Sequence, residues 1–155
     1  MNDKELLARD VITGQRGRAV ATVDGEVRIL FELKKVEATV TFEKQDIRTV
    51  GNLGTQSKVV GYKGAGTMTK YYVSSWDRKL AITYMKTGVV AFFTLLVEND
   101  DKSSSVGKQT TVLYDCSFDS TVLAKMDVDN QALEEDSPFT FGKAEILNEF
   151  VEPVF

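Results

Sequence analysis

The sequence predicts a mainly β protein, built as a β-sandwich or barrel-like unit with one short α-helix packed on the sheet. Apolar and polar residues alternate along residues 27–33 and 121–129, which is the period of half-buried strands. Residues 89–97 are apolar on both faces, which predicts a central strand covered on both sides. Helical spacing of apolar residues is confined to about residues 75–86.

Composition indicates a single domain of mildly acidic charge. The 155 residues fit one domain, residues 1–155, and 43% of them are apolar, which is enough for a core. The 19 basic and 23 acidic residues give a net charge of −4, so no basic excess is present to hold DNA through its phosphates. The first residues are charged, and no apolar run approaches the roughly 20 residues of a membrane helix, so we expect neither a secretory signal nor membrane insertion.

The first residues predict an arm that leads into a hairpin. Residues 1–17 show no clear period and are expected to form an N-terminal arm. Residues 18–23 are a predicted short strand. The pair Asp24-Gly25 that follows is a strong signal for a two-residue hairpin turn.

The next strand contains a change of phase. Apolar residues occupy odd positions along residues 27–33 and even positions along residues 36–42. Because side chains alternate between the two faces of a strand, this slip predicts a β-bulge or sharp bend at Lys34 and Lys35 within one long strand.

Residues 44–58 predict a long polar loop. A loop of about 15 residues is long for a compact domain and is usually functional or mobile. Scattered apolar and basic side chains on it are candidate contacts with another subunit, and they are Ile47, Arg48, Val50, Leu53 and Lys58.

The single predicted helix has a start, a stop and one apolar face. Ser74 is the expected N-cap, with Asp77 in a capping-box position, and Gly88 fits the stop. The face, which we expect to pack on the sheet, consists of Trp76, Leu80, Ala81, Tyr84 and Met85.

Three further segments are expected to extend the sheet. Residues 109–118 and 121–129 should pair as a hairpin across a two-residue turn, and an extended run should start at Pro138. Cys116 has no second cysteine to pair with and lies on the apolar side of its strand, where we expect a small buried side chain.

No residue pattern supports catalysis, a cofactor or a metal ion. The absence of histidine removes the usual triads and His-based metal sites. The glycine-rich residues 64–69 lack the third glycine of a dinucleotide loop, and Asp127 and Asp129 are not followed by the glycine and glutamate of a calcium loop. Paired carboxylates for glycoside chemistry stay open, although nothing places two of them in a cleft. We therefore predict a protein that is not an enzyme.

Five acidic residues form a candidate patch in the last third of the chain: Asp127, Asp129, Glu134, Glu135 and Asp136. One interpretation is a solvated face. The alternatives are a wall that repels passing DNA, or one side of an ion pair between subunits.

The order of features along residues 114–141 resembles the C-terminal part of tail tube proteins of contractile phages and of PBSX-type or bacteriocin-like particles of Gram-positive bacteria. These features are an aromatic strand, an alternating strand with a Val-Asp end, an acidic Ala-Leu-Glu-Glu segment and Pro-Phe-Thr-Phe. Upstream, the Gly- and Thr-rich residues 59–69, the short helix and the apolar residues 91–97 continue the likeness. It covers roughly residues 14–147.

The resemblance implies a structural protein that assembles with copies of itself. Its protomers would close into six-membered rings through an intersubunit β-barrel, and the rings would stack into a hollow tube. Further implied partners are the tail sheath, the baseplate or tube initiator, and the tape measure protein. DNA, or ions in a bacteriocin, would pass through without specific binding, in a particle assembled in the cytoplasm of the host bacterium.

Two other functions stay open. A monomeric β-barrel module that binds a small apolar ligand would explain the aromatic residues and the strands, but not the long loop. The other alternative is the tube protein of a type VI secretion apparatus, which has a similar fold.

Overall fold

The computed structural model describes residues 6–14, 16–129 and 132–152, so residues 1–5 and 15 of the expected arm lie outside the described part. The described chain is mainly β with one α-helix, as predicted. A short 3-10 helix, η1, precedes the sheet. In chain order the elements are η1 (Ala8–Asp10), β1 (Gly17–Val23), β2 (Glu26–Ile29), β3 (Leu33–Ile47), β4 (Gln56–Tyr71), α1 (Trp76–Thr87), β5 (Phe93–Asp100), β6 (Lys108–Phe118), β7 (Glu134–Phe141) and β8 (Lys143–Asn148).

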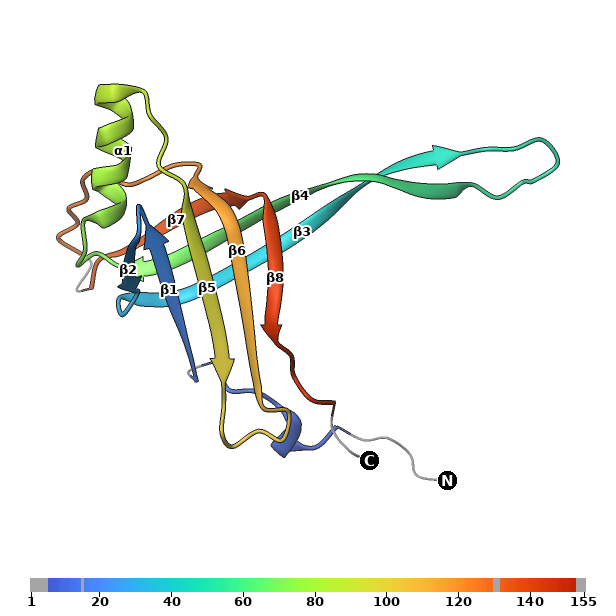
Figure 1. Ribbon diagram of the computed structural model, residues 1–155, viewed down its shortest axis with the longest axis horizontal. Helices are drawn as coiled ribbons and strands as arrows, with labels where there is room; N and C mark the ends of the chain where they lie inside the picture. The colour runs from blue at the N-terminus through green and yellow to red at the C-terminus, as the bar shows by residue number, and fades with distance from the viewer. Residues whose placement is uncertain (1–5, 15, 130–131, 153–155) are drawn as a thin grey trace.

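The strands form one antiparallel sheet in the order β2-β1-β5-β6-β7-β4-β3, and β8 joins it at β6. One edge of β6 pairs with two strands. β8 pairs with residues 110–114 of β6, and β7 pairs with Ser117 and Phe118. The chain turns from β7 into β8 at Gly142, whose N–H donates to the Tyr114 carbonyl. The sheet therefore folds over at β6, and β3, β4 and β7 cross β1, β5 and β6 at a large angle (Figure 1).

The core fills the space between the two parts of this folded sheet. Its buried residues come from β1, β4, β5, β6, β7 and α1, and they include Ala21, Met68, Trp76, Phe93, Leu95, Cys116 and Phe139. The ring centroids of Phe93 and Phe118 are 4.8 Å apart, and those of Trp76 and Phe93 are 5.9 Å apart in an edge-to-face arrangement. Cys116 is buried as expected, and burial raises the pKa of its thiol to about 11.

Two glycines of β4 let aromatic rings lie directly against the backbone. A Cβ at Gly64 would be 2.5 Å from the Phe141 ring, and one at Gly66 would be 2.5 Å from the Phe139 ring and 2.6 Å from the Glu37 carbonyl oxygen. The close backbone approach that glycine permits is thus what seats these two rings in the core.

The first hairpin and the helix end follow the sequence prediction. Asp24 and Gly25 both have positive φ, which is the turn that Asp-Gly favours between β1 and β2. Gly88 stops α1 in the left-handed conformation, and its N–H donates to the Tyr84 carbonyl. The predicted N-cap is wrong, because Ser75 holds that position without a side-chain hydrogen bond and Asp77 is turned into the protein.

The single bent strand expected around Lys34 and Lys35 is wrong. β2 ends at Ile29, a turn follows, and β3 begins at Leu33. The irregularity expected at Lys34 and Lys35 is present, because the register of β3 with β4 shifts between Leu33 and Lys35, but it lies at the start of β3 and not inside one long strand. Val27, Ile29 and Phe31 are exposed, and Leu30 is the buried residue of this segment.

The strand expected at residues 121–129 is also wrong, since the structure has no strand there. Both edges of β6 are already occupied, by β5 on one side and by β8 and β7 on the other. A following strand therefore finds no partner beside β6, and Met126 and Val128 are left exposed. The strand expected at residues 89–97 starts later than predicted, because residues 89–92 precede β5. The position of β5 between β1 and β6 agrees with the predicted central strand.

Candidate assembly surfaces

The residues expected to form a long loop form most of a projecting hairpin instead. β3 and β4 pair from Leu33 and Lys70 out to Ile47 and Gln56. β7 pairs with β4 only between Gly64 and Tyr71, so beyond that point the two strands pair only with each other. Figure 1 shows this hairpin leaving the body of the protein. Residues 44–58 of this hairpin carry no apolar alternation because neither of its faces is covered there, which is why the sequence suggested a loop.

The hairpin tip, residues 48–55, is a turn with two local hydrogen bonds and bare apolar side chains. The Asn52 N–H donates to the Thr49 carbonyl, and Asn52 Oδ1 accepts a 3.0 Å hydrogen bond from the Gly54 N–H. Val50 and Leu53 have relative exposures of 107% and 106%, as exposed as a side chain can be. Apolar side chains held in this way are suited to contact another surface.

All five candidate contact residues gather at this end of the hairpin. Ile47 is the last residue of β3, and Lys58 lies opposite Gln45 near the start of β4. Arg48, Val50 and Leu53 belong to the tip itself, and every one of the five is exposed.

Free sheet edges form a second candidate surface. Among the described residues, β2 pairs only with β1, β3 only with β4, and β8 only with β6. β2 and the turn after it expose Val27, Ile29 and Phe31, and β8 exposes Ile146 and Leu147. Unpaired backbone with apolar side chains is a template for strand addition by another chain.

The described part of the arm, residues 6–14 and 16, lies against the loop between β5 and β6 of its own chain. Asp101 Oδ2 accepts a 2.9 Å hydrogen bond from the Thr13 N–H, and Ser105 donates from its hydroxyl to Asp10 and from its N–H to the Arg9 carbonyl. The Thr13 hydrogen bond lowers the pKa of Asp101 below its ordinary value, and the Ser105 hydroxyl lowers that of Asp10. Two carboxylates thus hold the arm in place.

A third candidate surface is an apolar groove beside α1. The first turn of the helix is buried, but Tyr84 and Met85, expected in the core, are 52% and 70% exposed. A pocket of about 430 Å³ lies between this face and the chain after β6, and it is lined by Leu80, Tyr84, Met85, Val90, Phe118 and Leu123 together with Asp119. We call it the α1 groove.

A buried ionic cluster, absent from the sequence prediction, fixes the first turn of α1. Lys70 Nζ lies 2.6 Å from Asp77 Oδ2 and 3.6 Å from Glu135 Oε1, and Arg78 pairs with the second oxygen of Glu135. Glu32 accepts a 3.2 Å hydrogen bond from the Trp76 indole N–H. One signal in the sequence pointed to this cluster. The strand period places Lys70 two residues after Met68, and therefore on the same inward face of β4.

The five acidic residues proposed as a patch are not equivalent in the fold. Glu135 is buried in the ionic cluster. Glu134 pairs with Lys34 at 2.8 Å, and Asp136 accepts a hydrogen bond from the Thr69 hydroxyl. Asp127 and Asp129 are exposed on the segment after the α1 groove. Strand alternation in β7 turns Glu135 inward between two outward neighbours.

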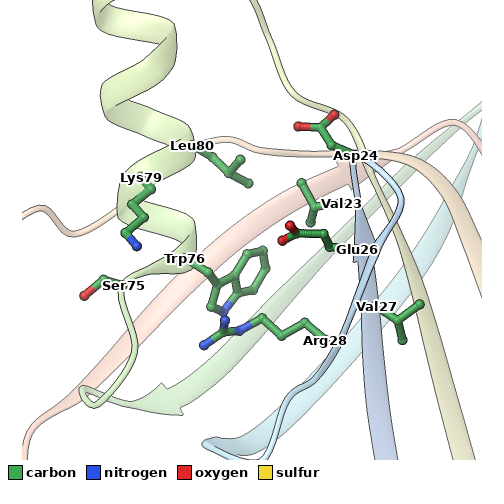
Figure 2. A pocket seen from close by; sticks show the side chains of 9 residues that line it. All are labelled: Val23, Asp24, Glu26, Val27, Arg28, Ser75, Trp76, Lys79 and Leu80. Atoms are coloured by element: carbon green, nitrogen blue, oxygen red, sulfur yellow. The ribbon is translucent and has the colours of Figure 1, made fainter.

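A pocket between the β1–β2 turn and α1 is lined by both charged and apolar side chains (Figure 2). Asp24, Glu26, Arg28 and Lys79 line it beside Trp76. Arg28 is held by a 2.9 Å hydrogen bond to the Ser74 hydroxyl. Charges of both signs around one indole suit a contact between protein surfaces.

The residues described contain no cluster of three or more His, Cys, Asp or Glu side chains placed to hold a metal ion. None of the helices in this part of the chain is both long and apolar enough to cross a membrane.

Comparison with known proteins identifies relatives of this fold and sequence. A family model described as phage tail tube protein matches residues 4–148. The chain is 40% identical over 136 residues to the phage-like element PBSX protein XkdM of Bacillus subtilis strain 168, covering 88% of this chain and 90% of that one.

Two solved structures are similar in fold at low sequence identity. A chain in the sheath/tube terminator of the PVC extracellular contractile injection system has a TM-score of 0.69 at 9% identity, covering 92% of this chain and 100% of that one. A chain in the sheath-tube complex of the same system has a TM-score of 0.62 at 11% identity, covering 90% and 93%.

Proposed function

Because this chain belongs to the phage tail tube protein family, we propose that it is the structural subunit of the inner tube of a contractile phage tail or phage tail-like particle. Six copies close into a ring, and rings stack into a hollow conduit for DNA, or for ions in a bacteriocin-type particle. The observation that carries the proposal is the projecting β3–β4 hairpin, whose tip exposes Val50 and Leu53 completely.

The free sheet edges support ring closure. A cyclic assembly with identical head-to-tail contacts can pair one edge of each subunit with a different edge of its neighbour. Such pairing removes the exposed edges of β2, β3 and β8 that would be an aggregation hazard in a monomer. The ring then carries an intersubunit β-barrel that no single subunit closes.

The proposed partners follow from this role. They are further copies of the chain, the tail sheath, the baseplate or tube initiator, and the tape measure protein, in a particle assembled in the host cytoplasm. Solved structures of similar fold come from a baseplate, a tube-terminating cap and a sheath-tube complex. DNA passes without specific binding, so we propose a neutral to acidic lumen, in keeping with the net charge of −4.

The experiment that tests the proposal is the solution mass of the pure protein over a concentration series, with negative-stain images of the same samples. Rings or tubes are expected. A compact monomer at all concentrations would instead favour a monomeric module. Hydrogen exchange on the monomer and the tube tests the role of the arm and of the hairpin, since both should gain protection on assembly.

A further inference from the structure

The α1 groove and the hairpin tip are two of the exposed apolar surfaces that the described part of the chain leaves uncovered. The groove presents Tyr84, Met85 and Leu123 to solvent, and the tip presents Val50 and Leu53. Figure 1 shows that α1 and the tip lie at opposite ends of the longest dimension of the protein. A tip therefore cannot reach the groove of its own chain.

The two surfaces are both apolar, and they are complementary in charge. Arg48 is the one charged residue of the tip, residues 48–55, and Lys44, Asp46 and Lys58 lie on the adjoining strands, so residues 44–58 carry three basic side chains and one acidic one. Asp119 is the one charged residue that lines the α1 groove, and Lys125, Asp127 and Asp129 lie exposed on the segment that continues from it. The end of the hairpin is thus net basic, and the groove with the segment that follows it is net acidic.

We propose that the α1 groove of one copy receives the hairpin tip of another copy, with Val50 and Leu53 in the groove and Arg48 beside Asp119. This inference rests on the proposed tube function and adds the surface that the hairpin meets. A contact between two different surfaces at opposite ends of one chain is heterologous. Repetition of such a contact builds rings or filaments and does not stop at a pair of subunits. It also buries the half of the α1 face that the subunit leaves exposed.

A cysteine pair tests the contact directly. The variant Leu53→Cys/Met85→Cys is assembled under reducing conditions and then oxidised. Cys116 is buried with a raised thiol pKa, so it stays silent. We expect disulfide-linked ladders of subunits in the double variant, and none in either single variant.

The outcomes separate this inference from the proposed function. Tubes that form without the disulfide, while the thiol introduced by Met85→Cys still reacts with a maleimide, would overturn the contact and leave the tube function standing. A parent protein that never forms rings or tubes would overturn both.

A charge exchange gives an independent test that requires no oxidation. Arg48→Asp or Asp119→Arg alone places like charges together, which should raise the concentration needed for assembly by about tenfold or more. The double variant should recover most of that loss. Lys102→Asp, in the exposed β5–β6 loop, is the matched control and should have little effect. A double variant no better than the worse single one would refute the pairing.

Discussion

Lys70 and Asp77 form an ion pair 2.6 Å long from Nζ to Oδ2 with side chains only 1% and 0% exposed. This pair joins the end of β4 to the first turn of α1, and Glu135 and Arg78 extend it to β7. The helix is therefore fixed at one end by buried charges. Its second half is left free to line the α1 groove.

Removing Lys70 should be strongly destabilising. The variant Lys70→Met leaves Asp77 and Glu135 buried without their shared cation, which should cost about 3–5 kcal/mol of unfolding free energy. Arg18→Ala, which breaks the more exposed pair with Glu98, is the matched control and should cost about 0–1 kcal/mol. Urea unfolding at concentrations below assembly measures both. Equal small losses in the two variants would show that the cluster does not hold the helix.

A methyl group at Gly66 should disturb the core. The added Cβ of Gly66→Ala would meet both the Phe139 ring and the Glu37 backbone, and overpacking of this kind costs about 1–3 kcal/mol. Gly54→Ala at the hairpin tip meets only an ordinary contact at 3.5 Å with Asn52 Oδ1 and should be close to neutral. Thermal unfolding of the two variants compares them. A neutral Gly66→Ala would contradict the close backbone approach.

Shortening the hairpin should separate folding from assembly. Lys44 and Val59 face each other across β3 and β4, so an Asn-Gly turn in place of residues 45–58 keeps the register. Because the removed residues contact only each other, the variant should fold and melt as the parent does while forming no rings or tubes. Circular dichroism and sedimentation measure the two properties. Normal tubes from this variant would remove the hairpin from the assembly.

Low pH should release the arm from the body. The pKa of Asp101 is lowered from its ordinary 3.8 by hydrogen bonds from Thr13 and Ser103. The ionised carboxylate therefore stabilises the docked arm above that pH, and this stabilisation is lost as the pH falls through the lower folded-state pKa. Hydrogen exchange at residues 12–14 should therefore rise, relative to the core strands, as the pH falls below 3.8. Asp101→Asn should show the same rise already at pH 7. Protection at residues 12–14 that does not change in either case would contradict this role of the carboxylate.

Local signals in the sequence predicted the parts of the fold that local chemistry decides. Asp24-Gly25 specified its turn and Gly88 its helix end, because each supplies a positive φ at low steric cost. The run from Pro138 to Phe141 also lies in a strand, as predicted. These elements could be predicted without knowing which strands or helices lie beside them.

Parts of the fold that depend on partners were not predictable in this way. Residues 121–129 have strand periodicity, but β6 offers them no free edge. Residues 44–47 and 56–58 lack periodicity and are nevertheless strands, since they pair with each other in solvent. The ionic cluster joins Lys70, Asp77 and Glu135, whose proximity depends on the crossing of three elements and on no local pattern.

Cryo-electron microscopy of the purified, assembled protein tests the central claim most directly. The account predicts end-on views with six-fold symmetry around an open channel, and side views of stacked rings joined by the β3–β4 hairpins. A protein that stays monomeric at every concentration, or that assembles into particles with no continuous axial channel, would contradict it.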